Sequence, residues 1–267
     1  MRAGASRSPR RVRVLACVDR VFVPASAIDG DRALLEGEAR RHAGGALRLR
    51  AGDRFLATDG AGREFLLETE DAGRHRLCAR VVETRTPVPG PGALLTLAIS
   101  PPKGSRMDTA VEKAVECGVG RVIPIECERS VVRARDDSAR ARRWQRIARS
   151  ATVQSGGVTV PEVDRFRSFA AAFADLSAAG VVLLAHAAGG AVPVAEALGP
   201  GDAAVGVGIF VGPEGGFSPG EVEVAVERGA TLVTLGDTRL RTETAGIVAV
   251  ALAVAALARG GPHHREG

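Results

Sequence analysis

Two short stretches near the C-terminus decide the fold: Val211-Gly212-Pro213-Glu214-Gly215-Gly216-Phe217-Ser218 and Leu235-Gly236-Asp237-Thr238-Arg239-Leu240-Arg241-Thr242-Glu243-Thr244-Ala245. Each follows a short apolar run that predicts a buried strand, and each precedes a helical pattern. Loops at the ends of adjacent parallel strands can together form one pocket, so we expect a small-molecule site here. For the first loop alone, a tight turn without any ligand is an equally good interpretation of the glycines.

The chain around these loops alternates between apolar runs and amphipathic segments, which predicts a parallel sheet covered by helices on both faces. The segment from Ser218 has Pro219 at its first helical position and Glu221 as its third, the pattern of a capping box. The predicted strands are 94–100, 122–125, 181–185, 208–211 and 231–235, and the predicted helices are 103–117, 138–154, one from 218 and 242–258.

Two familiar nucleotide-binding motifs do not fit the glycine-bearing loops. A P-loop requires a lysine after its last glycine, and none follows Gly216. Gly206-Val207-Gly208 lies inside a predicted strand and lacks a third glycine, so it does not match the dinucleotide-binding fingerprint. The sequence therefore excludes the two commonest ways in which such loops bind phosphates.

The N-terminal part has a different pattern, with short β-like runs separated by turn residues such as Asp59-Gly60-Ala61-Gly62. This pattern predicts a small β-barrel. Thr86 to Gly92 contains three prolines and two glycines, which is typical of a linker. We expect a flexible extension over 1–17, the barrel over 18–88 and a second domain over 93–267.

Positive charge is concentrated in the N-terminal third of the chain. Residues 1–88 hold 17 arginines and 12 acids, whereas residues 89–267 hold 19 basic and 19 acidic residues. A second arginine-rich stretch runs from Arg129 to Arg149. Such surfaces fit a phosphate-rich partner such as RNA, although a solvated arginine-rich face is the competing interpretation. With eight Phe, one Trp and no Tyr, recognition of RNA shape and backbone is favoured over base stacking.

The cysteines and the apolar runs exclude other classes of protein. The four cysteines form no C-x-x-C pair and have no histidine at metal spacing, so we expect no metal and a reducing compartment, the cytoplasm. The basic N-terminus is not followed by a signal-like apolar segment. The longest apolar run, Ala245 to Ala258, is shorter than the roughly 20 residues of a spanning helix, so we expect no membrane contact.

The two loops closely resemble the signatures of the ribosomal RNA small-subunit methyltransferase E family, in the SPOUT class of knotted RNA methyltransferases. The resemblance extends over about residues 20–258, through Lys103 to Asp108, Glu112 to Val119 and, in the N-terminal part, Arg20 to Val23, His42, Leu47 to Leu49, Gly52-Asp53 and Asp59 to Gly62. The sequence departs from the family pattern at Ala43-Gly44-Gly45, Val153 and Gly157.

The resemblance implies a SPOUT-type parallel sheet with a C-terminal trefoil knot, preceded by a PUA-like barrel that binds RNA. It implies S-adenosylmethionine as the cofactor, transfer of its methyl group to N3 of a uridine in 16S rRNA of the small ribosomal subunit, and a homodimer. Two alternatives stay open: another SPOUT enzyme, such as a tRNA or rRNA ribose 2'-O-methyltransferase, and a non-catalytic RNA-binding factor in ribosome assembly.

The resemblance also implies roles for individual residues. Arg241 is the candidate for stabilising a uracil anion, and Glu243 is a candidate base that could instead serve as a helix N-terminal acid. His186 could form a third wall of the cofactor site or be structural. The expected cofactor-binding residues are Val211, Gly212, Gly216, Leu235, Gly236, Leu240 and Thr242, and the expected RNA-binding residues are Arg20, Arg48, Arg50, Arg106 and Arg133.

Overall fold

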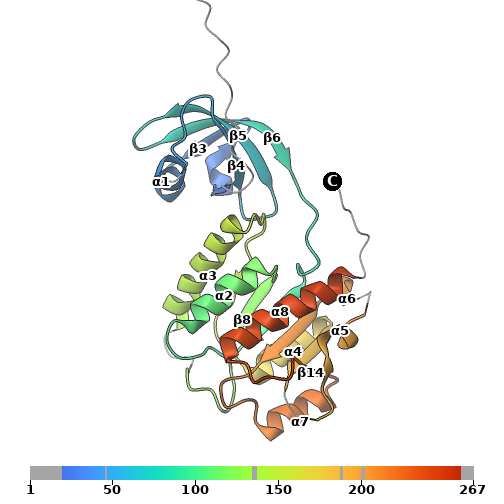
Figure 1. Ribbon diagram of the computed structural model, residues 1–267. Helices are drawn as coiled ribbons and strands as arrows, with labels where there is room; N and C mark the ends of the chain where they lie inside the picture. The colour runs from blue at the N-terminus through green and yellow to red at the C-terminus, as the bar shows by residue number, and fades with distance from the viewer. Residues whose placement is uncertain (1–19, 46, 134–136, 187–188, 200–201, 260–267) are drawn as a thin grey trace, which may run out of the picture. The chain divides into compact units, whose positions relative to one another are not determined.

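The computed structural model describes residues 20–45, 47–133, 137–186, 189–199 and 202–259 (Figure 1). It divides the chain into two compact units, one formed by residues 1–87 and 153–159, the other by 88–152 and 160–267. The division after residue 87 falls inside the proline-rich stretch that predicted a linker. The extension expected over 1–17 lies outside the described residues.

The first unit is built on one six-stranded sheet with the order β1-β4-β5-β6-β3-β2. Neighbouring strands are antiparallel except β1 and β4. Its core is formed by alternate residues of these strands, among them Val21, Phe55 and Leu67. The elements are β1 (Arg20–Phe22), η1 (Ala25–Ala27), β2 (Ile28–Asp29), β3 (Arg32–Leu35), α1 (Gly37–Gly45), β4 (Arg54–Thr58), β5 (Glu64–Ala72) and β6 (Leu77–Arg85).

The hairpin predicted at Asp59 is confirmed, because β4 and β5 pair around it. The Asp59 carboxylate accepts hydrogen bonds from the backbone N–H groups of Ala61 and Arg63 and from the Arg63 side chain. Burial alone raises the pKa of this carboxyl, but these hydrogen bonds outweigh burial and hold the pKa below its usual value. The strand pattern missed the helix α1 and the short strands β2 and β3.

Residues 153–159 belong to the first unit, although the helix over Asp137–Gln154, with which they overlap, lies mostly in the second. Thr58 Oγ1 donates to the Val158 carbonyl at 3.0 Å, and Ala61 forms an isolated bridge with Thr159. Arg20 donates to the Gly156 carbonyl. Nothing in the local pattern of the sequence predicted these long-range contacts.

The second unit is an α/β fold with an entirely parallel sheet. The strand order is β10-β8-β7-β13-β11-β14-β12, with β9 also paired to β8. The strands are β7 (Leu95–Ile99), β8 (Arg121–Glu126), β9 (Glu162–Val163), β10 (Arg167–Ser168), β11 (Val181–Ala185), β12 (Val192–Pro193), β13 (Val207–Val211) and β14 (Thr231–Thr234). The helices are α2 (Arg106–Glu116), α3 (Asp137–Gln154), α4 (Phe169–Ala179), α5 (Val194–Ala197), α6 (Asp202–Val205), α7 (Pro219–Glu227) and α8 (Thr242–Ala258).

Helices cover both faces of this sheet, as predicted. On one face, Leu97 and Ile209 of the strands share a core with side chains of α2, α3, α5 and α8. On the other, Ile123 and Phe210 pack against side chains of α4 and α7. The helix over 242–258 has its predicted bounds. The helix predicted over 138–154 is α3, which begins one residue earlier, at Asp137. Among the described helices, none is long and apolar enough to cross a membrane.

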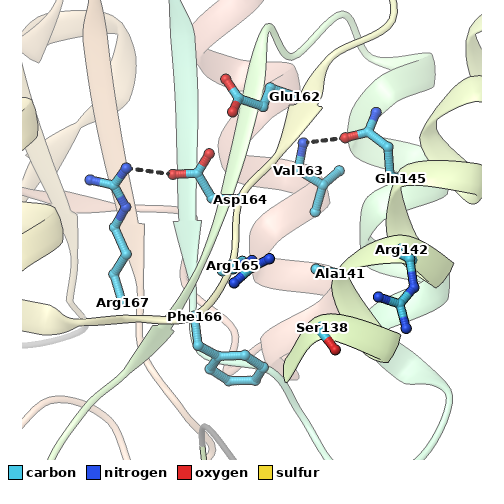
Figure 2. Close-up of a pocket in the computed structure, with 10 residues that line it drawn as sticks. All are labelled: Ser138, Ala141, Arg142, Gln145, Glu162, Val163, Asp164, Arg165, Phe166 and Arg167. Atoms are coloured by element: carbon cyan, nitrogen blue, oxygen red, sulfur yellow. Dashed lines mark hydrogen bonds and ion pairs between the residues drawn. The ribbon is translucent and has the colours of Figure 1, made fainter. Parts of the chain in front are cut away.

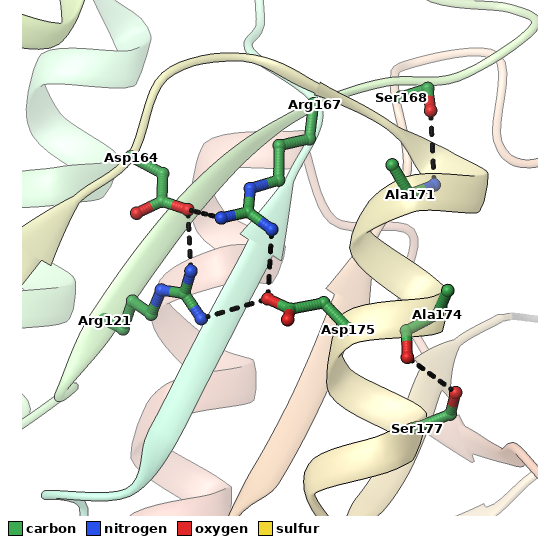
Figure 3. Close-up of polar contacts among 8 residues, drawn as sticks. All are labelled: Arg121, Asp164, Arg167, Ser168, Ala171, Ala174, Asp175 and Ser177. Atoms are coloured by element: carbon green, nitrogen blue, oxygen red, sulfur yellow. Dashed lines mark hydrogen bonds and ion pairs between the residues drawn. The ribbon is translucent and has the colours of Figure 1, made fainter.

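An ion-pair quartet joins strand β8 to the segment before α4 and to α4 itself (Figure 3). Asp164 Oδ2 lies 2.8 Å from Arg121 Nη2 and 2.9 Å from Arg167 Nη2. Asp175 Oδ2 lies 3.3 Å from Arg121 Nη1 and 3.0 Å from Arg167 Nη1. The Asp164 side chain is only 6 % exposed, so two guanidinium groups compensate a nearly buried charge.

Candidate active site

Three strands of the parallel sheet end together at the place where the candidate loops begin. Val211 of β13 is in register with Ala185 of β11, and Ala185 is in register with Val233 of β14. The expectation that the two loops follow adjacent strands is wrong, because β11 lies between β13 and β14. Hydrophobic patterns define strands but not their order, since a helical connection can skip a position in the sheet.

The first loop, Gly212 to Phe217, is a tight turn held by its own backbone and by a buried ring. The Gly216 N–H donates to the Pro213 carbonyl at 2.8 Å, and Gly216 has a φ of +70°. A Cβ atom at Gly212 would lie 3.2 Å from the Phe217 ring. Glycine at 212 therefore allows close packing within the loop, and glycine at 216 allows the left-handed turn.

Arg129, three residues after the end of β8, anchors this loop from outside. Its Nη1 donates to the carbonyls of Gly215 at 3.1 Å and Phe217 at 3.2 Å. The sequence predicted Arg129 only as part of an RNA-docking stretch. Its position beside the loop depends on contacts with residues 86 and 88 positions away along the chain, and no local pattern carries that information.

The helix α7 after the first loop begins with the predicted capping box. Ser218 Oγ accepts from the Glu221 N–H at 3.3 Å, and Glu221 Oε2 accepts from the Ser218 N–H at 2.9 Å. The other carboxylate oxygen of Glu221 accepts from the Glu128 N–H at 2.9 Å. Glu221 thus caps its own helix and also ties it to the segment that contains Arg129.

The second loop, Leu235 to Arg241, contacts the first loop directly. Thr242 Oγ1 donates to the Gly212 carbonyl at 3.3 Å, and Arg239 Nη2 donates to the Glu214 carbonyl at 3.4 Å. Gly236 has a φ of +128°, and a Cβ atom there would meet no atom within 4 Å. The two signature stretches therefore lie side by side, as the sequence predicted, although their strands are not neighbours.

The seven residues expected at a cofactor all lie on these joined loops or at their ends. Val211 and Thr242 are buried, Gly236 is exposed, and the other four are half-buried. A Cβ atom at Gly216 would also meet no atom within 4 Å, so the backbone faces open space at both positive-φ glycines. This arrangement fits a ligand that lies against backbone groups.

Charged side chains cluster beside the loops. Glu243, in the first turn of α8, has a side chain that is 14 % exposed, with its Oε1 3.9 Å from Arg106 Nε. Its Oε2 is buried and has no hydrogen-bond partner within the described part of the chain. Arg106 Nη1 also lies 3.8 Å from Glu214 Oε1. Arg241, the N-cap residue of α8, is exposed and makes no side-chain capping bond.

His186 and Cys127 complete the description of this edge of the sheet. The His186 backbone N–H donates to the Val233 carbonyl at 3.0 Å, which fixes the end of β11 beside β14. Burial raises the pKa of the Cys127 thiol to about 12, so this cysteine is protonated at neutral pH. No cluster of three or more His, Cys, Asp or Glu side chains that could hold a metal occurs in the described ranges.

The five expected RNA-binding arginines are divided between the two units. Arg20 is held within the first unit, with its Nη2 2.7 Å from Glu64 Oε1 and a side chain that is 12 % exposed. Arg48 and Arg50 are exposed in the same unit. In the second unit, Arg106 is described above, and Arg133 is exposed with its Nη1 3.0 Å from Glu126 Oε1.

Comparison with known proteins defines the class first. The model of an RNA methyltransferase domain matches residues 91–254, and the model of an RNA methyltransferase PUA domain matches residues 35–82. The chain is therefore an RNA methyltransferase with a PUA domain. It is 35% identical over 235 residues to ribosomal RNA small subunit methyltransferase E of Mycobacterium tuberculosis, covering 83% of this chain and 85% of the relative. The chain belongs to the ribosomal RNA small subunit methyltransferase E family.

Solved structures agree with this assignment. A probable rRNA-methyltransferase from Porphyromonas gingivalis superposes with a TM-score of 0.79 at 35% identity, over 90% of this chain and 99% of that one. A ribosomal RNA small subunit methyltransferase E from Neisseria gonorrhoeae, bound to S-adenosyl methionine, gives a TM-score of 0.76 at 31% identity, over 88% and 96%. The α/β fold with a parallel sheet and a PUA domain is confirmed.

Proposed function

We propose that this protein transfers a methyl group from S-adenosylmethionine to N3 of one uridine in the 16S rRNA of the small ribosomal subunit. The observation that carries the proposal is the direct contact between its two signature loops through Thr242 and Gly212. Two motifs that bind the same cofactor molecule must lie in one continuous site. The family's name and the cofactor bound to a relative supply the reaction class.

The proposed cofactor site is formed by backbone and apolar groups of the joined loops. Gly216 and Gly236 leave their backbone groups accessible because no side chain covers them. Leu235 and Leu240 are half-buried and provide apolar surface for an adenine ring. Val211 and Gly212 form the floor where β13 ends, and Thr242 keeps the floor in place by its hydrogen bond to Gly212.

The cofactor supplies a methyl group already activated by its sulfonium, so the protein's main contribution is to orient the uridine. Orientation of this kind accounts for up to about 7–11 kcal/mol of a reaction barrier. N3 of uracil carries a proton that must leave as the new N–C bond forms. Glu243 is the proposed acceptor, since its Oε2 has no partner within the described residues. Arg241 is proposed to stabilise the negative charge on the base.

We further propose that the C-terminal segment forms a trefoil knot. Strand β14 pairs with β11 and β12, yet α8, which follows it, packs against β7, β13 and α2. The loop from Leu235 to Arg241 must therefore cross the end of β11 to reach Gly212. This crossing supports a threaded backbone, an exception to the usual rule that chains are not knotted.

A homodimer is proposed from the surface of α8. One side of this helix, including Ala249 and Val250, is fully buried in the core. On the other side Leu252 is 39 % exposed, and Ala251 and Ala255 are also exposed. An exposed apolar strip of this kind favours association with a second copy.

RNA docking is proposed on exposed arginines of both units. Arg48 and Arg50 in the PUA domain, and Arg106 and Arg133 in the methyltransferase domain, have exposed side chains for phosphate contacts. The barrel domain over residues 18–88 is proposed to bind RNA, and the domain over 93–267 to carry the reaction. A cytoplasmic location is proposed with it, because the proposed substrate is ribosomal RNA.

The proposal is tested by incubating the protein with labelled cofactor and small ribosomal subunits that lack the modification, and then mapping the labelled nucleotide. We expect one labelled uridine in 16S rRNA, with the methyl group on N3. A label on a ribose 2'-oxygen, in large-subunit rRNA or in tRNA would contradict the proposed target. Binding of RNA without any transfer would instead support a non-catalytic assembly factor.

A further inference from the structure

A groove of about 620 Å³ lies in the second unit. It lies at the edge of the parallel sheet formed by β8, β9 and β10, away from the edge that contains β14. One wall is helix α3 and the other is the segment that contains β9 and leads into β10 (Figure 2). None of the residues assigned above to cofactor or catalysis lines it. The lining residues are Ser138, Ala141, Arg142, Gln145, Glu162, Val163, Asp164, Arg165, Phe166 and Arg167.

The two walls of the groove are held together by the side-chain amide of Gln145. Gln145 Nε2 donates to the Pro161 carbonyl at 2.9 Å, and Gln145 Oε1 accepts from the Val163 N–H at 2.9 Å. The next residue, Asp164, is fixed by its ion pairs with Arg121 and Arg167 (Figure 3). The groove is therefore preformed rather than assembled by what binds there.

The charge available in the groove is positive. Asp164 and Arg167 are used in the quartet, which leaves Arg142, Arg165 and Glu162 as exposed charged groups of the lining. Within the described residues, neither Arg142 nor Arg165 has an ion-pair or hydrogen-bond partner for its side chain. Figure 2 shows Arg165 in the middle of the lining residues. Arg146 lies one helical turn beyond Arg142 and is also exposed, which extends the positive face.

An aromatic ring lies among these arginines. Phe166 is half-buried, and its ring centroid lies 5.9 Å from that of Trp144, the single tryptophan of the chain. This packing holds the Phe166 ring at the end of the groove where Ser138 lies (Figure 2). Guanidinium groups beside a fixed aromatic ring match the chemistry of a nucleotide, with phosphates for the arginines and a base for the ring.

We propose that this groove binds an unpaired nucleotide of the RNA substrate at a distance from the base that is methylated. Arg142 and Arg165 contact the phosphates on either side, and the base stacks on Phe166. The inference rests on the proposed RNA substrate but assigns it a second, separate contact. An acidic peptide would use the arginines but not the ring, so RNA is the partner that uses the whole groove.

The test compares R142Q/R165Q with R228Q/R259Q, a control that removes the same charge from two exposed arginines at the ends of α7 and α8. Affinity for a short fluorescent single-stranded RNA is measured by anisotropy at several salt concentrations. We expect R142Q/R165Q to bind about ten-fold more weakly, with a salt slope shallower by about 1.4 because two phosphate contacts are lost. The control variant R228Q/R259Q should retain most of the wild-type affinity for this RNA.

A second variant, F166L, keeps an apolar side chain against Trp144 but removes the stacking surface. We expect it to lower RNA affinity by roughly five-fold or more, while affinity for S-adenosylmethionine is unchanged. RNA affinities equal to wild type in R142Q/R165Q and F166L would overturn the groove. The proposal would also be overturned if R142Q/R165Q weakened the binding of poly-glutamate but not the binding of RNA.

The outcome is separable from that of the proposed function. Both groove variants could bind RNA more weakly while the wild-type protein fails to methylate small subunits. That result would support the nucleotide-binding groove and contradict the proposed reaction. The wild-type protein could instead methylate the expected uridine while R142Q/R165Q shows an unchanged KM for small subunits. That result would support the proposed reaction and contradict the nucleotide-binding groove.

Discussion

Gly216 and Gly229 have the same backbone requirement in different surroundings. Their φ angles are +70° and +88°, and a Cβ atom at either would meet no atom within 4 Å. Gly216 lies on the loop proposed to hold the cofactor, whereas Gly229 lies in the turn between α7 and β14. Substituting each glycine in turn therefore separates the strain that a side chain causes in the backbone from the effect of that side chain on ligand binding.

We expect Gly216→Ala and Gly229→Ala each to lower the free energy of unfolding by about 1 kcal/mol, because L-residues are strained at positive φ. Only Gly216→Ala should weaken S-adenosylmethionine binding, with Kd rising roughly ten-fold, equivalent to about 1.4 kcal/mol. Calorimetry with the cofactor measures this. Equal cofactor affinities in the two variants would argue against a cofactor at Gly216.

At this scale the sequence predicted more about the loops than about the groups that support them. Gly212, Gly216 and Thr242 could be singled out because they stand in local motifs. Arg129 could not be assigned to the loop, since its hydrogen bonds to Gly215 and Phe217 depend on tertiary packing. The involvement of Arg20 with Glu64 was missed for the same reason.

Among the elements, the edge of the sheet at β8 and β10 depends on a nearly buried charge. Asp164 is 6 % exposed on its side chain, whereas its counterpart Asp175 is 44 % exposed. Loss of Asp164 leaves Arg121 and Arg167 with only the more exposed carboxylate of Asp175 to neutralise them. Loss of Asp175 leaves the inner pair intact.

We predict that Asp164→Asn lowers the free energy of unfolding of the second unit by about 2 kcal/mol, less than a fully buried pair would lose. Asp175→Asn should cost less than about 1 kcal/mol, as expected for an exposed pair. Urea unfolding followed by the fluorescence of Trp144, which is buried in this unit, provides the measurement. Equal losses in both variants would show that burial does not set the strength of the quartet.

Elements with strong patterns were predicted well, and weakly patterned ones were missed. The capping box at Ser218 placed the start of α7 correctly, and the helix predicted over 242–258 has the bounds of α8. Helix α4 was missed because its Ala-rich sequence is apolar on nearly every side, so it shows little contrast between faces. The two-residue strands β9, β10 and β12 are too short to produce a periodic pattern.

For the whole molecule, the strand order is the feature that periodicity could not supply. The sequence predicted a parallel sheet but placed the two loops on adjacent strands. The structure instead separates β13 and β14 by β11, and brings the loops together through the segment that leads into α8. The cofactor proposal therefore depends on the path of the chain across the sheet rather than on neighbouring strands.

The most direct test of this account is hydrogen–deuterium exchange of the full chain with and without S-adenosylmethionine. We predict slower exchange on cofactor addition in residues 211–218 and 235–243 together, because both loops would lie against the same ligand. The PUA domain serves as the internal reference and should be unchanged. Protection of only one loop, or protection confined to another part of the sheet, would contradict the joined site.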